Sequence, residues 1–259
     1  MTTHAAPGGK TNDATTSATV EIPLADGTVL PAYVARPARP PSTAVIVAHE
    51  LFGVTPQFRG VADELASAGY LAIAPEYYHR AAPAGRWLER DAAGREEGFG
   101  YLRQLERQHA VDDTAACMGW ASAEHGCVRT GMIGFSAGGH LAYLAACLLP
   151  IDRTAVLYGG WLPVTDIPLS QPTPTLDLTP GISGRLLYLV GEDDFLISAG
   201  QRRQIAEALR AAGTDHELVS YPGAAHAFWW PGTPEFNSRA RDDAWRRILA
   251  LLADPDAAA

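Results

Sequence analysis

Short apolar runs and amphipathic segments alternate along most of this chain. Unbroken apolar runs rich in β-branched residues are typical of strands buried in a parallel sheet, and apolar residues at helical spacing are typical of the covering helices. The runs that predict strands are 18–24, 28–35, 44–48, 70–74, 128–134, 155–158, 186–190 and 216–221. The segments that predict helices are 57–68, 95–109, 114–124, 140–149, 199–212 and 235–253. Their alternation predicts an α/β fold with a doubly wound, mostly parallel sheet flanked by helices.

Turn residues and irregular stretches separate these segments. Asp26-Gly27 is a strong hairpin signal between the first two expected strands. Five prolines between residues 163 and 184 predict an irregular excursion. Residues 1–17, biased toward Gly, Thr and Ala, and residues 254–259 are expected to be disordered tails. We therefore predict a single domain over residues 18–253.

The composition narrows the class of protein. A length of 259 residues with 47% apolar and 19% charged residues suits one globular α/β domain. A net charge of -9 disfavours nucleic acid and anionic membrane surfaces as partners. No apolar run approaches the roughly 20 residues that span a bilayer, and the first residues do not resemble a secretory signal. These features predict a cytoplasmic protein.

The three cysteines, Cys117, Cys127 and Cys147, indicate no special chemistry. They show no C-x-x-C spacing, no Cys/His cluster of metal-ligand spacing accompanies them, and an odd number cannot pair completely. We expect free thiols in a reducing compartment and no metal site.

A G-x-S-x-G motif at Gly134–Gly138 carries the first candidate for chemistry. It follows an expected strand and precedes an expected helix, which is the setting of a nucleophile elbow, where a sharp turn exposes a serine hydroxyl. Ser136 is the candidate nucleophile. The alternative is a glycine-rich turn whose serine has no chemical role.

A serine nucleophile needs a base and a group that orients the base. Candidates for both follow later strands, at the sheet edge where catalytic groups gather. His226 follows the last expected strand and is the candidate base. Asp193 is the preferred orienting carboxylate, with Asp194 as the nearest competitor and Glu192 as a weaker one; the other two acids would then be solvated or helix-capping residues.

An oxyanion needs two backbone donors. Ala137 follows the candidate nucleophile at a helix N-terminus and is expected to supply one. The second is expected from the loop after the strand at 44–48, where Leu51 is the candidate.

Motifs along the chain resemble those of the dienelactone hydrolase family, in the order in which that family has them. The resemblance extends from about residue 19 to 252 and rests on His49–Val54, Arg59, Gly69-Tyr70, Ala74–Tyr78, Gly134–Gly139, Tyr158-Gly159, Gly191–Phe195, Tyr221, His226 and Phe228. It implies an α/β-hydrolase fold, hydrolysis of a lactone or other carboxylic ester, and no metal or organic cofactor. It matches Asp193 and His226 to the family's triad acid and histidine. Glu50 matches a glutamate that helps to set the nucleophile's ionisation; the alternative is a buried, hydrogen-bonded loop acid.

The chain departs from the family pattern at two places. Members acting on dienelactone carry cysteine at the elbow, whereas this chain has Ser136. Because a serine hydroxyl has a high pKa, the reaction must then transfer its proton to His226 as a general base. Trp230 stands where a second substrate-binding arginine is expected. We predict a bulkier, less acidic substrate, in a pocket formed by Arg95, Phe99, Trp161, Phe228, Trp229 and Trp230. Arg95 is equally well explained as a solvated surface residue.

The residues thus predict a serine-dependent hydrolase that forms an acyl-Ser136 intermediate. The alternative is an acyltransferase or ring-closing enzyme of secondary metabolism with the same triad. A third hypothesis is a non-catalytic binding protein on the same scaffold. The expected partner is a small-molecule ester or lactone, and the expected assembly is a monomer or homodimer.

Overall fold

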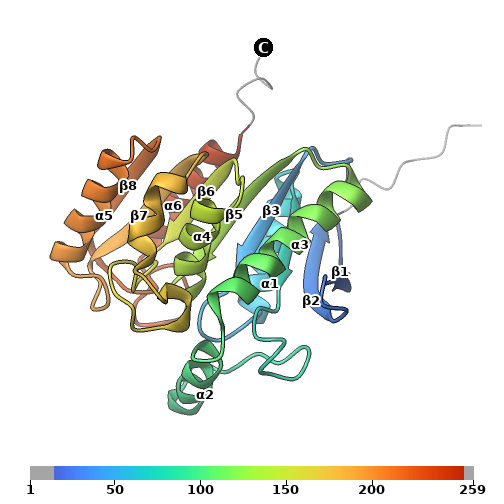
Figure 1. Cartoon of the computed structure of the whole chain (residues 1–259), viewed down its shortest axis with the longest axis horizontal. Helices are drawn as coiled ribbons and strands as arrows, with labels where there is room; N and C mark the ends of the chain where they lie inside the picture. The colour runs from blue at the N-terminus through green and yellow to red at the C-terminus, as the bar shows by residue number, and fades with distance from the viewer. Residues whose placement is uncertain (1–14, 254–259) are drawn as a thin grey trace, which may run out of the picture.

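The computed structural model describes residues 15–253. One eight-stranded sheet runs through them in the order β1-β2-β4-β3-β5-β6-β7-β8 (Figure 1). Its strands are β1 (Thr16–Pro23), β2 (Val29–Arg36), β3 (Thr43–Ala48), β4 (Leu71–Pro75), β5 (Arg129–Phe135), β6 (Arg153–Leu157), β7 (Arg185–Asp193) and β8 (His216–Ala225). β2 pairs antiparallel with β1 and β4, and the other pairs are parallel. The predicted doubly wound, mostly parallel sheet is confirmed.

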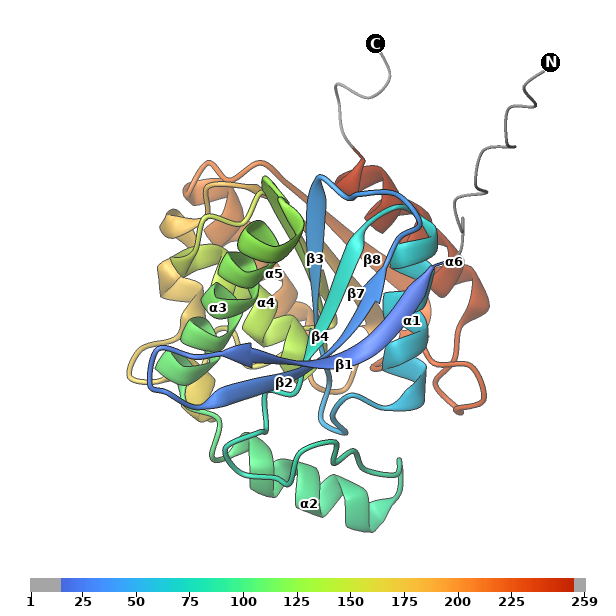
Figure 2. The same ribbon diagram turned by 90° about the vertical axis from the view of Figure 1, so that its right-hand side faces the viewer.

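Helices cover both faces of this sheet. They are α1 (Pro56–Ser67), α2 (Ala92–Leu102), α3 (Arg107–His125), α4 (Ala137–Leu148), α5 (Ala199–Ala211) and α6 (Ser238–Leu252), with short 3₁₀ helices at Pro168–Ser170 and Thr175–Gly181. Figure 2 shows α3, α4 and α5 on one face and α1 and α6 on the other, whereas α2 lies apart from both layers, below the sheet.

Local sequence fixes where several helices begin. Thr55 accepts the N–H of Phe58 before α1, and Asp91 accepts the N–H of Gly94 before α2. Ser198 and Gln201 form a reciprocal capping box at the start of α5. Each cap satisfies N–H groups that have no partner within the helix, an effect worth about 1 kcal/mol.

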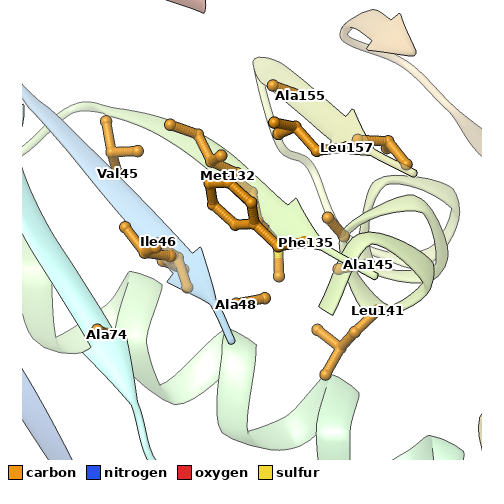
Figure 3. Close-up of a cluster of buried hydrophobic side chains, with 14 of the residues drawn as sticks. Val45, Ile46, Ala48, Ala74, Met132, Phe135, Leu141, Ala145, Ala155 and Leu157 are labelled. Atoms are coloured by element: carbon orange, nitrogen blue, oxygen red, sulfur yellow. The ribbon is translucent and has the colours of Figure 1, made fainter. Parts of the chain in front are cut away.

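The core extends over both faces of the central strands, and α4 covers one part of it. Figure 3 shows Val45 and Ile46 of β3, Met132 and Phe135 of β5, and Leu141 of α4 among its side chains, all buried. Burying a side chain of this size stabilises the fold by about 1.5–3 kcal/mol. Because the central strands are buried on both faces, their sequences are continuously apolar rather than alternating.

One predicted helix is divided in the structure. The helix expected at 95–109 is parts of two helices, since α2 ends at Leu102 and α3 begins at Arg107. α3 then continues through the helix expected at 114–124. Leu102 at the end of α2 and Leu105 in the turn between the helices are both buried, so an uninterrupted apolar pattern conceals the break.

The domain also begins earlier than the predicted residue 18, because Thr16 and Ser17 pair with β2. The rest of the predicted N-terminal tail up to residue 14, and the predicted tail at 254–259, lie outside the described residues.

Candidate active site

Ser136 occupies a strained turn between β5 and α4. Its backbone has φ 53° and ψ -113°, a conformation that costs free energy for a residue with a side chain. A Cβ on Gly134 would overlap the backbone of Gly138, and a Cβ on Gly138 would overlap the carbonyl oxygens of Ala48 and His49. Both motif glycines are therefore required by close backbone approach, as predicted for a nucleophile elbow.

Strained backbone gathers around this turn. Among residues 15–253, the non-glycine residues with positive φ are Ser136 (53°), Tyr158 (40°), Trp161 (58°) and Ala227 (63°). They follow β5, β6 and β8, at the carboxyl ends of parallel strands in one half of the sheet. Strain of this kind persists where surrounding structure enforces it, and it is concentrated at functional sites.

His226 lies directly against the candidate nucleophile. It follows the last residue of β8, and its Nε2 is 2.8 Å from Oγ of Ser136. Both residues are buried, with exposed fractions of 8% for His226 and 9% for Ser136. The Tyr158 ring packs against the imidazole in a T-shaped contact, with the ring centroids 5.1 Å apart. The structure therefore brings together the predicted nucleophile and base.

The carboxylate that meets His226 is Asp194, not Asp193 as predicted. Oδ2 of Asp194 is 2.8 Å from Nδ1 of His226, and its Oδ1 accepts the N–H groups of Leu196 (2.8 Å) and Ile197 (3.1 Å). Asp193 is the last residue of β7 and its side chain is exposed. Successive side chains in extended chain point to opposite sides, so only one of two adjacent aspartates can face the histidine.

The two predicted oxyanion donors follow neighbouring strands of the sheet, Leu51 after β3 and Ala137 after β5. Ala137 begins α4, where the first N–H groups have no partner within the helix. Leu51 is half-buried in the loop after β3, and Gly138 holds α4 against the end of that strand. A methyl group on Gly98 of α2 would be only 2.7 Å from the carbonyl oxygen of Leu51, so α2 packs closely on this loop.

Glu50 is engaged by two side chains. Its Oε1 is 2.5 Å from Nη2 of Arg90, and its Oε2 accepts the indole N–H of Trp230 at 2.8 Å. Arg90 stacks on the Trp230 ring (4.8 Å) and the Phe52 ring (5.2 Å). Burial raises the pKa of Glu50, and the Arg90 charge and the Trp230 hydrogen bond oppose this rise.

Sequence reasoning missed Arg90. It lies in the irregular stretch before α2, where no periodicity distinguishes it from the other arginines there, Arg80 and Arg86. Arg95, which was predicted as a pocket residue, is exposed on α2. The arginine that reaches the site comes from outside the helix that was expected to offer one.

Most of the predicted aromatic pocket belongs to the core. Phe228, Trp229 and Trp230 are at most 2% exposed. The Phe228 ring packs against Tyr158 and Tyr221. The Trp229 ring packs against Phe135 and Trp245, and the Trp230 ring against Phe58 and Phe135. The loop after β8 folds back on the sheet, with the Asn237 N–H bound to the carbonyl of Phe228, and burial of large apolar rings favours this packing.

Trp161 and Phe99 are half-buried and remain pocket candidates.

Within residues 15–253, no cluster of three or more Cys, His, Asp or Glu side chains is arranged to hold a metal ion. Over the same range no helix is long and apolar enough to cross a membrane. Cys117, Cys127 and Cys147 are free and buried.

A family comparison agrees with the site. The model of the dienelactone hydrolase family matches residues 30–255. The chain belongs to this family. It is accordingly a hydrolase of the carboxylic-ester and lactone type, and the resemblance inferred from its motifs is confirmed.

Relatives and solved structures extend this result over nearly the whole domain. A protein of Escherichia coli named "Putative carboxymethylenebutenolidase" is 32% identical over 92% of this chain and 87% of its own length. One of the same name from Yersinia pestis is 34% identical over 86% of this chain and 83% of its own. The crystal structure of a "Putative Dienelactone Hydrolase" from Klebsiella pneumoniae, 30% identical, superposes with a TM-score of 0.82 over 92% of this chain and 98% of its own.

The fold of this dienelactone hydrolase family member is therefore the α/β-hydrolase fold that the motifs implied. The family description and the names of these relatives favour hydrolysis over the acyl-transfer or ring-closing alternative.

Proposed function

We propose that this protein hydrolyses a lactone or other small carboxylic ester through an acyl-Ser136 intermediate. The observation that carries the proposal is the unbroken contact chain from Ser136 Oγ to His226 Nε2 and from His226 Nδ1 to Asp194 Oδ2, each step 2.8 Å. The names of the relatives, which contain the term carboxymethylenebutenolidase, support a lactone or ester as the substrate class.

The proposed reaction moves one proton along this chain of contacts. The Asp194 carboxylate accepts the Nδ1–H of His226, which leaves Nε2 free to take the Ser136 proton as the oxygen attacks the ester carbonyl. The oxyanion that forms would be bound by the N–H groups of Ala137 and Leu51. His226 then gives the proton to the leaving alcohol oxygen, and later activates the water that releases the acid and regenerates Ser136.

We assign Glu50 a positioning role rather than a proton-transfer role. Both of its oxygens are engaged, one by Arg90 and the other by Trp230. A serine hydroxyl needs a base at hydrogen-bond distance, and His226 occupies that position. Glu50 thus fixes Trp230 and Arg90 at the edge of the site, and the thiolate gating that a cysteine enzyme allows has no counterpart here.

We also propose a cytoplasmic location, which the three free, buried cysteines support.

The proposal is tested with Ser136→Ala and His226→Ala, assayed on p-nitrophenyl acetate and on an aryl lactone such as dihydrocoumarin. Loss of either triad member should lower kcat/KM by about 10³-fold or more, because the members act as a unit. Circular dichroism and the unfolding midpoint control for folding. Turnover of both substrates at wild-type rates by Ser136→Ala would contradict the mechanism.

A further inference from the structure

Phe195 is a large apolar side chain left in solvent beside the triad. It follows Asp194 directly and is 81% exposed, although Asp194 before it and Ile197 two residues after it are buried. Its ring meets the imidazole of His226 edge to face, with the centroids 5.3 Å apart and an interplanar angle of 64°. It therefore combines exposure to solvent with contact to the proposed acid–base group.

The backbone that carries Phe195 is held on both sides. Oδ1 of Asp194 accepts the N–H groups of Leu196 and Ile197, and Nη1 of Arg202 donates to the carbonyl of Ile197 at 2.9 Å. The loop also packs against the loop after β6, since a Cβ on Gly160 would be 2.8 Å from Cδ2 of Leu196. The turn thus presents the Phe195 ring to solvent in a fixed place.

The proton route places one part of an ester next to this ring. When the tetrahedral intermediate collapses, His226 must deliver its proton to the oxygen of the leaving alcohol, so that oxygen lies within hydrogen-bond reach of the imidazole. The oxyanion lies toward Ala137 and Leu51. Tyr158 and Phe195 both make T-shaped ring contacts with the imidazole. Tyr158 is fully buried, whereas Phe195 is exposed to solvent.

We propose that Phe195 is a specificity-determining residue that binds the apolar, alcohol-derived part of the substrate against His226. In a lactone, this part is the carbon skeleton on the oxygen side of the ring. The proposal deepens the proposed function and rests on it, because it requires His226 to protonate the leaving oxygen. It predicts a preference for esters of aromatic or other bulky apolar alcohols over esters of small ones.

Two acetates of alcohols with similar acidity, benzyl acetate and ethyl acetate, provide the test. Both give the same acetyl-enzyme, so a difference in kcat/KM between them reports the alcohol part alone. In Phe195→Ala the ratio of kcat/KM for benzyl over ethyl acetate should fall about fivefold to tenfold, the size expected for one lost aromatic contact. The change should appear mainly as a higher KM for benzyl acetate. Phe195→Leu should keep part of the preference.

Phe236→Ala is the matched control, since Phe236 is also an exposed phenylalanine (36%) but lies in the loop before α6. Its benzyl-to-ethyl ratio should equal that of the wild type. An unchanged ratio in Phe195→Ala, or an equal fall in Phe236→Ala, would overturn the proposal. Failure of the proposed function is a different result: ethyl acetate turnover that survives Ser136→Ala, whatever residue stands at 195.

Discussion

Oδ2 of Asp194 lies 2.8 Å from Nδ1 of His226, while Oδ1 of the same carboxylate accepts two backbone N–H groups from Leu196 and Ile197. One oxygen is thus held by the turn after β7 and the other holds the imidazole. The carboxylate links the end of one strand to the residue that follows the next, since β7 and β8 are neighbours in the sheet. Asp194 therefore orients the His226 ring, and in the proposed mechanism it also keeps the imidazole proton on Nδ1.

Asp194→Asn should lower kcat by about 10³- to 10⁴-fold with little change in fold, because an amide N–H facing Nδ1 favours the wrong imidazole tautomer. Asp193→Asn is the matched control, since Asp193 directly precedes Asp194 and its side chain is exposed. It should keep ester hydrolysis within about twofold of the wild type. Steady-state kinetics on p-nitrophenyl acetate compare the two; the reverse order of effects would restore Asp193 as the orienting acid.

Arg90→Ala should destabilise the protein by about 2 to 3 kcal/mol, because it leaves the buried Glu50 carboxylate without its ion-pair partner. Burial already raises the pKa of Glu50, and losing the Arg90 charge raises it further. A raised folded-state pKa favours the protonated acid, so the penalty grows as the pH rises above the unfolded-state value. Urea unfolding should show a larger defect at pH 8 than at pH 5.

The double variant Glu50→Gln/Arg90→Ala is the control for this prediction. Removing the charge of Glu50 should recover most of the lost stability and abolish the pH dependence of the defect. The stacking of Arg90 on Trp230 stays lost in the double variant. A double variant as unstable as Arg90→Ala would show that the ion pair is not the cause.

Gly138→Ala should destabilise the fold by about 3 kcal/mol and reduce activity, since a methyl group there would overlap the carbonyl oxygens of Ala48 and His49. Gly119→Ala is the contrasting variant. It lies in α3, and beyond the adjoining residues and backbone of that helix no atom lies within 4 Å of the new Cβ, so alanine should stabilise the helix by about 1 kcal/mol. Thermal unfolding measures both, and equal effects of the two substitutions would contradict the role given to Gly138.

His140 should make stability depend on pH. Burial lowers its pKa to about 4, and its Nδ1 and Nε2 lie 2.8 Å and 2.9 Å from the Gly160 carbonyl and Thr175 Oγ1. Because the unfolded chain binds the proton first, the contribution is complete above the unfolded pKa, near pH 6.5, and is lost as the pH falls toward 4. The loss of stability between pH 7 and pH 4.5 should be about 2 to 3 kcal/mol smaller in His140→Gln than in the wild type.

His49 supplies a parallel contribution, since burial also lowers its pKa to about 4, and His140→Gln leaves that contribution in place. Denaturant unfolding at the two pH values measures the difference. The same loss of stability in wild type and variant would show that His140 is not a source of the acid sensitivity.

The elbow and the histidine could be found from sequence because local backbone chemistry dictates them. Gly134 and Gly138 are needed wherever a strand turns this sharply into a helix, and His226 follows the last strand that the sequence predicts after the acidic loop. The choice between Asp193 and Asp194 could not be made in this way. It depends on which of two adjacent residues ends β7, and a shift of one residue reverses the side to which a side chain points.

Two other parts of the site depend on tertiary packing that the pattern does not encode. Glu50 and Arg90 form an ion pair, but Arg90 lies in an irregular stretch whose sequence has no periodicity that predicts its position. The run Phe228–Trp230 shows that large apolar rings follow β8, but not whether the loop turns them toward a substrate or back onto the sheet. Burial against Phe58 and Phe135 decides that question.

The most direct test of the account is the mass of the protein quenched in acid within the first turnovers of p-nitrophenyl acetate. We predict a wild-type species heavier by one acetyl group, with the acetyl group on the peptide that contains Ser136, and no such species in Ser136→Ala. His226→Ala should accumulate it far more slowly, because Ser136 then lacks its base. Acetylation of another residue, or turnover with no acyl-enzyme in any variant that keeps Ser136, would contradict the serine mechanism.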